Sequence, residues 1–253
     1  MQIRNERSGG CRKMDCSETP RENLVLKALG TFLLRTLLLG ALSISAQAGE
    51  NPSLKSELLR LAHDWERVKL QVIDRDDQER QMAGLAQRAE KIAKQYENVP
   101  DPRIWLGILD SEQAALANEN GSPLKAWGLA KRARDILETV EKSDPVTMDA
   151  GAPTTLGLLY DQVPGFPIGF GDKIKARQYL QEAMRNAPNA LDVNYFYGDF
   201  LYREGEITEA IKVLEHALTL PELSNRPNWD RSLRVKIRKM LSEQQQTVGA
   251  PAH

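Results

Sequence analysis

Apolar residues recur every three or four positions along most of the chain after residue 52. The first such stripe consists of Leu54, Leu58, Leu61, Trp65, Val68 and Val72, a spacing typical of the buried face of an α-helix. The same periodicity predicts further helices, broken by prolines and glycines, over about 75–97, from Pro102 to about 117, and over 123–142, 153–162, 172–186, 189–203, 206–219 and 228–245. No stretch alternates β-branched and aromatic residues with period two over five positions. The sequence therefore predicts an all-α fold whose short turns make neighbouring helices antiparallel.

Three segments share one local pattern, in which a glycine at a turn is followed by an alanine five residues later. They begin at Gly121, Gly171 and Gly205, and glycine suits the left-handed backbone at such turns. Two of the alanines, Ala176 and Ala210, lie 34 residues apart, which is the period of tetratricopeptide repeats. The stretch 188–221 resembles such a repeat strongly, 150–188 resembles one with an insertion, and 102–145 resembles one loosely.

The resemblance implies a tetratricopeptide-like α-solenoid of antiparallel helix pairs. A terminal repeat leaves an apolar face that needs a cap, so the last helix is expected to cover it with Leu233, Ile237, Met240 and Leu241. Arg231, Arg234, Arg238 and Lys239 give that helix a positive stripe, read here as its solvated face. The alternative is a surface for an acidic partner or a membrane.

The insertion, residues 157–172, reads GLLYDQVPGFPIGFGD and is followed by Lys175-Ala176. It resembles exported bacterial helical-repeat proteins related to the T component of TRAP-type solute transporters. In that group the loop joins the two helices of one repeat, and the family brings no catalytic residues.

The N-terminal part carries the features of a secretory signal peptide. Lys27 and Arg35 precede an uncharged, leucine-rich stretch over 36–45, and Ala46-Gln47-Ala48 has the small-x-small pattern of a cleavage site. An uncleaved anchor over 28–45 is the alternative, but Arg35 would be costly inside a bilayer. We expect cleavage after Ala48 and a periplasmic or secreted protein. The predicted organisation is an extension plus signal peptide over 1–48, a helical-repeat domain over 49–246 and a disordered tail over 247–253.

Charge and cysteine content exclude several classes of function. The 253 residues carry 34 basic and 35 acidic side chains, a net charge of −1, which is too balanced for nucleic-acid binding by bulk charge. Seven of the basic and four of the acidic residues lie within 1–48, so residues 49–253 carry 27 and 31, a net charge of −4. Cys11 and Cys16 also precede the predicted cleavage site. The exported chain is thus expected to use neither disulfides nor thiol chemistry.

The glycine-rich loop over 165–173 invites comparison with a phosphate-binding loop. Phe170 stands where that motif needs glycine, and Asp172 would repel phosphate. Two interpretations stay open. In the first, Phe166, Ile168 and Phe170 pack on the repeats while Asp172 caps the next helix. In the second, Tyr160, Phe166 and Phe170 form the rim of a solute pocket.

No catalytic or metal-binding constellation stands out in the sequence. His63 and His216 have no ligand partner at helical spacing, and no serine nucleophile elbow is visible. We therefore predict no cofactor, no metal site and no enzyme.

The leading hypothesis is a non-enzymatic periplasmic adaptor that binds a peptide or protein partner. If the last repeat follows the resembled family, its first helix lines a concave groove with Asp192, Tyr195, Asp199 and Tyr202, which would favour a basic or aromatic segment. Packing between repeats is the plainer interpretation of these four residues. The rival hypothesis is a solute-binding accessory of a TRAP-type transporter, with its ligand near 161–172. Neither involves nucleic acid, and membrane contact is expected through an uncleaved signal segment alone.

Overall fold

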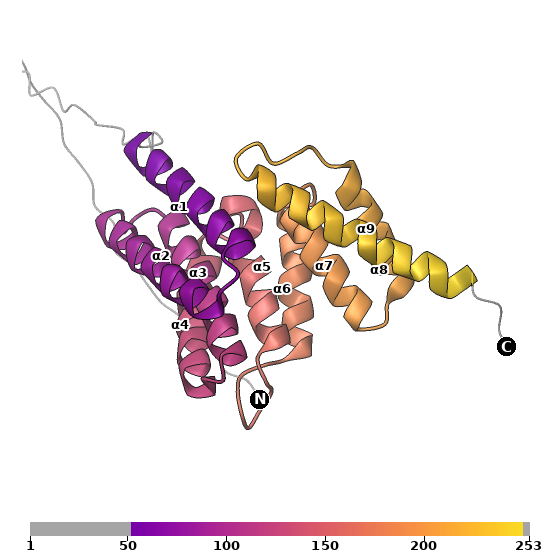
Figure 1. The fold of residues 1–253 in the computed structure, drawn as a ribbon, viewed down its shortest axis with the longest axis horizontal. Coiled ribbons are helices and arrows are strands. Elements are labelled where there is room, and N and C mark those ends of the chain that lie inside the picture. Colours follow the sequence, from indigo (N-terminus) through magenta and orange to yellow (C-terminus); the bar gives the residue numbers. More distant parts are fainter. Residues whose placement is uncertain (1–51, 250–253) are drawn as a thin grey trace, which may run out of the picture. The chain divides into compact units, whose positions relative to one another are not determined.

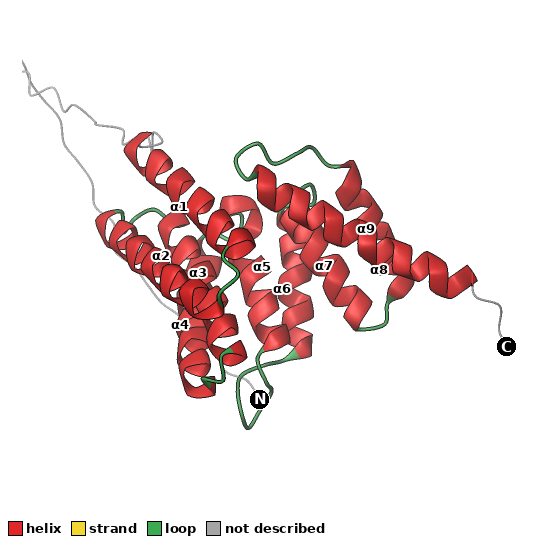
Figure 2. Cartoon of the chain, viewed as in Figure 1, coloured by secondary structure: helices red, strands yellow, loops and turns green. Residues whose placement is uncertain are grey.

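The computed structural model describes residues 52–249, and within them every regular element is a helix. Figures 1 and 2 show the arrangement of the helices: α1 to α8 run roughly antiparallel to their neighbours in the chain, and α9 lies across α7 and α8. The helices are α1 (Pro52–Gln71), α2 (Arg75–Gln95), α3 (Asp101–Glu119), α4 (Pro123–Ser143), α5 (Thr147–Gln162), α6 (Lys173–Asn186), α7 (Leu191–Arg203), α8 (Ile207–Thr219) and α9 (Pro227–Gly249). These bounds confirm the predicted all-α class and agree closely with the predicted helices, except at the start of α5.

The helices pack as four consecutive pairs, α1–α2, α3–α4, α5–α6 and α7–α8. Along the series, the first helix of one pair also contacts the first helix of the next, as α3 does with α5 and α5 with α7. We call α1, α3, α5 and α7 the inner helices. The signal peptide and cleavage site predicted over 1–48 lie outside the described residues, and the predicted domain end at 246 falls inside α9.

A glycine on the inner helix receives a leucine from its partner in three of the four pairs. A Cβ on Gly107 would lie 2.5 Å from Leu137, and a Cβ on Gly157 or Gly198 would lie 2.6 Å from Leu180 or Leu214. The three leucines are almost fully buried. A methyl group at any of the three glycines would therefore overlap the opposing leucine, which would have to move.

Replacing Gly198 with alanine is expected to destabilise the protein by about 1–3 kcal/mol, because the added methyl group overpacks Leu214. Gly128→Ala is the matched control, since a Cβ at Gly128 meets nothing within 4 Å and alanine favours the helix by up to about 1 kcal/mol. Denaturant unfolding measures both. Equal changes in the free energy of unfolding would show that close helix contact is not the reason for glycine at position 198.

The three turn glycines fall into two physical classes. Gly121 and Gly205 have φ of +73° and +82°, which confirms the predicted left-handed turns. Gly171 is different, because a Cβ there would lie 1.8 Å from the carbonyl oxygen of Val163. Glycine at position 171 allows the two ends of the α5–α6 loop to approach each other.

Helix α5 opens with a turn that the sequence did not predict. Met148, Asp149 and Ala150 have φ of +53°, +52° and +59°, so one left-handed turn precedes the right-handed helix. Such backbone costs about 1–2 kcal/mol for each residue with a side chain. The Ala150 N–H donates to the Val146 carbonyl at 3.1 Å, and the Ala150 carbonyl accepts from the Thr154 hydroxyl at 2.7 Å. The right-handed part of α5 starts after Ala150, close to the predicted start near 153, and the turn before it was not predicted.

Helix α9 caps the last pair as predicted, with Leu233 and Ile237 fully buried and contacts to both α7 and α8. Assignment of Arg234 to the solvated face was wrong. Arg234 is buried, pairs with Asp230 at 2.7 Å and donates to the carbonyls of Leu218, Leu220 and Pro221. It thereby satisfies carbonyl groups at the end of α8 that lack helical partners. Arg231, Arg238 and Lys239 are exposed.

Candidate functional site

The inner helices and the start of α9 surround a cavity of about 730 Å³. Such a volume lies within the range of small-ligand and side-chain pockets, which span roughly 300–1,000 Å³. Its walls carry five aromatic residues, Trp65, Tyr96, Trp105, Phe196 and Trp229. Aliphatic side chains complete much of the lining, mainly Leu54, Leu58, Ile108, Met148 and Leu158. A second hollow of about 680 Å³, between α2, α3 and α4, is lined largely by charged side chains.

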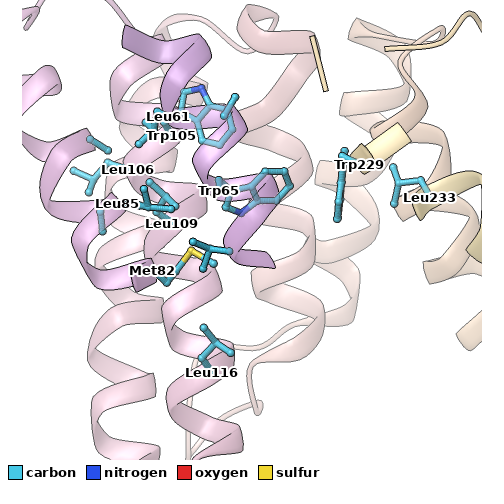
Figure 3. Close-up of a cluster of buried hydrophobic side chains, with 14 of the residues drawn as sticks. Leu61, Trp65, Met82, Leu85, Trp105, Leu106, Leu109, Leu116, Trp229 and Leu233 are labelled. Atoms are coloured by element: carbon cyan, nitrogen blue, oxygen red, sulfur yellow. The ribbon is translucent and has the colours of Figure 1, made fainter. Parts of the chain in front are cut away.

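Trp65 on α1, the first helix, contacts both α3 and the last helix, α9. Its ring contacts Trp105 of α3 and Trp229 of α9 edge to face, with centroids 5.8 and 4.8 Å away. Figure 3 shows Trp65 extending from α1 within this buried cluster, with Trp105 and Trp229 beside it. The first helix and the capping helix thus meet at the cavity, although they are far apart in sequence.

Polar contacts support the same junction. The buried Glu66 carboxylate accepts a hydrogen bond from the backbone N–H of Trp229 at 2.6 Å, in the first turn of α9. A carboxylate at that position satisfies a donor with no helical partner and complements the positive end of the helix dipole. The His63 ring lies 3.1 Å from the carbonyl oxygen of Asn225. Helix α1 therefore supplies the cap of α9 from outside that helix.

Asp192, at the start of α7, lines the cavity and is held by two donors. Its carboxylate pairs with Arg226 at 2.5 Å and accepts a hydrogen bond from the indole N–H of Trp229. Asp192 therefore takes part in the α7–α9 contact, and its charge is balanced within the chain.

The other three residues of the predicted binding face make separate contacts along α7, and none of them lines the cavity. Tyr195 packs against Phe196 and lies beneath the ammonium of Lys236, and burial raises the pKa of its hydroxyl to about 12. Asp199 pairs with Arg203 at 3.0 Å. Tyr202 packs against the buried cluster formed by α3–α8. A direct role of the four residues in binding stays a prediction, with Asp192 alone placed at the cavity.

The predicted loop residues separate into packed and exposed ones. Tyr160 is buried, donates a hydrogen bond to Glu138 at 2.6 Å and stacks on Tyr179; burial, then the Glu138 contact, raises its pKa. Phe170 packs edge to face on Tyr160 with centroids 5.4 Å apart. Asp172 caps α6 by accepting from the N–H groups of Ile174 and Lys175, as predicted.

The expectation that Phe166 and Ile168 pack on the repeats was wrong. Their side chains are 94% and 77% exposed, because the loop folds on itself through the approach of Gly165 and Gly171 and directs its tip outward. None of Tyr160, Phe166 and Phe170 lines the cavity. Their role in a solute pocket stays a prediction.

The described residues hold no group of three or more His, Cys, Asp or Glu side chains placed to bind a metal ion. Over the same range no helix is long and apolar enough to span a bilayer.

Sequence reasoning missed most of the cavity. Trp65 belongs to a helical stripe visible in the sequence, but nothing local indicates that it meets Trp229, more than 160 residues away. The left-handed turn gave little local signal, because aspartate tolerates such backbone but Met148 and Ala150 on either side of it do not favour it.

Comparison with known proteins establishes the class of fold and no family. No family model matches the chain, and no curated protein matches its sequence. A thermophilic tetratricopeptide-repeat protein of Thermus thermophilus superposes with a TM-score of 0.50 at 20% identity, over 78% of this chain and 83% of that chain. A de novo designed helical repeat protein aligns with a TM-score of 0.34 at 19% identity, over 76% of this chain and 98% of that chain.

The likeness to the Thermus protein confirms the predicted tetratricopeptide-like architecture. Solenoids of this class present extended concave surfaces. In this structure the aromatic cavity lies between the inner helices and the start of α9.

Proposed function

We propose that this protein is an exported, non-enzymatic adaptor that binds a peptide segment of a protein partner in the cavity between its inner helices. The observation that carries the proposal is the cavity itself, with an aromatic wall contributed by α1, α3, α7 and α9. Tryptophan and tyrosine offer large contact areas at low cost in side-chain entropy. Anchors of that kind dominate the binding energy of many protein interfaces.

The shape of the cavity favours an occupant of limited size over a long peptide lying in an open groove. Helix α1 reaches α9 across the concave side through Trp65 and Glu66. A partner would therefore insert a few side chains between the inner helices. Export rests on the signal peptide predicted before residue 49, and the proposal places the adaptor in the periplasm.

Filling the cavity is expected to abolish partner binding while preserving the fold. Ser111 lines the cavity from α3 and is half-buried, so Ser111→Trp places an indole where the partner's side chain would lie. Ala115, one turn further along α3, is exposed and outside the lining, and Ala115→Trp is the matched control. Partners captured in living cells by the full chain should be lost with the first variant and retained with the second, as measured by quantitative mass spectrometry.

Circular dichroism and thermal unfolding of both variants separate loss of binding from loss of fold. Retention of the same partners by a folded Ser111→Trp variant would contradict the proposal, because the cavity would then not be the binding site.

The cavity also supports the rival function, a solute-binding accessory of a TRAP-type transporter, because its volume suits a small metabolite. A metabolite present at 100 times its dissociation constant would raise the free energy of unfolding by about 2.7 kcal/mol. Thermal-shift screening of the wild type and Ser111→Trp would detect such a ligand. Stabilisation of the wild type alone would favour this function.

A further inference from the structure

Six charged side chains line the cavity, and most are already neutralised within the chain. Glu112 pairs with Lys69, and Asp192 pairs with Arg226. Lys55 and Asp101 each have an interaction partner of their own. Asp149 is the remaining charged residue of the lining; it is exposed, and nothing among the described residues pairs with its carboxylate.

The backbone fixes Asp149 at the edge of the cavity. It is the middle residue of the left-handed turn, with φ of +52° and ψ of +47°. Its neighbour Met148 lines the cavity, while Ala150 is fully buried against residues of α6 and α7. The buried alanine and the packed methionine hold the turn from both sides. The backbone of Asp149 is therefore held at the exposed edge of the cavity, and its carboxylate stays within reach of that edge.

The aromatic wall adds a second attraction for positive charge. Aromatic faces attract an ammonium or guanidinium group within about 6 Å of the ring centroid. This wall already does so on another side, where the ammonium of Lys236 lies 5.5 Å from the centroid of Trp229. The cavity thus offers an unpaired carboxylate at its mouth and aromatic rings within.

We propose that the cavity selects a partner segment in which a lysine or arginine lies next to a bulky apolar residue. The apolar side chain enters between Trp65, Trp105 and Phe196, and the cationic group binds at Asp149. This inference rests on the proposed function, since it specifies the chemistry of the segment that the adaptor binds.

Three blocked tripeptides, acetyl-Leu-X-Leu-amide with lysine, glutamine or glutamate at X, test the charge preference. The chain has four tryptophans, of which Trp65, Trp105 and Trp229 line the cavity. In a Trp127→Phe background, tryptophan fluorescence therefore reports on the cavity. The lysine peptide is expected to bind at least tenfold more tightly than the glutamate peptide, with glutamine between them. Added salt should reduce the difference, because it screens exposed charges.

In the Asp149→Asn variant, the lysine peptide should bind only about twofold more tightly than the glutamate peptide, or less. Asparagine adopts left-handed backbone readily, so the turn is kept while the charge is removed. Glu215→Gln is the matched control, because Glu215 is an exposed carboxylate on α8 outside the cavity, and it should leave the ratio unchanged. Asp149→Gly, which also keeps the turn, should reproduce the effect of asparagine.

Loss of charge selection and loss of peptide binding would give different results in this experiment. Equal binding of the lysine and glutamate peptides, or an unchanged ratio in Asp149→Asn, would overturn the charge selection and leave peptide binding standing. If none of the three peptides binds while n-octylamine does, the cavity would be a site for small amines. That result would overturn the proposed adaptor function together with this inference.

Discussion

Replacing Trp65 with alanine is expected to lower the free energy of unfolding by about 3–5 kcal/mol, the usual cost of truncating a buried aromatic side chain. Trp65 is 3% exposed and contacts both Trp105 and Trp229. Its loss removes the packing of α1 on α3 and on α9 at once. Chemical denaturation followed by circular dichroism measures the change.

Trp127→Ala is the control for the loss of Trp65. Trp127 is 47% exposed and its ring contacts Lys131, so its removal should cost about 1 kcal/mol or less. Amide hydrogen exchange adds a spatial test, because opening the junction should reduce protection in α1 and in the first turn of α9 together. Reduced protection confined to α1 would show that the two helices do not stabilise each other.

Replacing Asp230 with alanine is expected to cost about 3–5 kcal/mol at neutral pH, because it leaves the buried Arg234 guanidinium without its ion-pair partner. Burial alone would raise the pKa of Asp230, but hydrogen bonds from Arg234 and from the backbone N–H of Leu223 hold it below its usual value. A carboxyl group with a lowered pKa in the folded state stabilises the protein above its unfolded pKa, near about 4. That contribution to stability is lost as the pH falls through the pKa of Asp230 in the folded state.

The difference in stability between wild type and Asp230→Ala should therefore be full at pH 7 and shrink below about pH 4. Denaturant midpoints across this pH range measure it. Asp135→Asn is the control, since Asp135 is exposed and its ion pair with the half-buried Arg134 is worth at most about 1 kcal/mol. A difference that stays constant from pH 7 to pH 2 would mean that the charge of Asp230 does not stabilise the α8–α9 turn.

The helices were predictable from sequence because the signals that define them are local. Apolar spacing identifies the buried faces, and glycines such as Gly205 and prolines such as Pro102 lie within a few residues of the ends that they determine. The repeat pattern around Ala176 and Ala210 was sufficient to predict the class of fold. The left-handed turn at Met148–Ala150 was not predictable, because tertiary packing of Ala150 imposes it against local preference.

The site was less predictable than the fold because contacts distant in sequence create it. Glu66 caps α9 at Trp229, a pair of residues 163 positions apart, and this contact places α1 at the cavity. The resemblance to tetratricopeptide repeats led to Asp192, which does line the cavity. The sequence alone could not show that the Asp192 carboxylate already accepts hydrogen bonds from Arg226 and from the indole of Trp229.

Site-specific photo-crosslinking tests the central claim, that a partner enters the cavity between the inner helices. A benzophenone amino acid at position 111 places the reactive group inside the cavity, and the same group at position 115 lies on the exposed part of α3. The full chain, expressed in living cells and irradiated, is expected to form a specific protein adduct from position 111 and none from position 115. Asp149→Asn should weaken that adduct. Crosslinking from position 115 with none from position 111 would contradict the claim and locate the binding surface elsewhere.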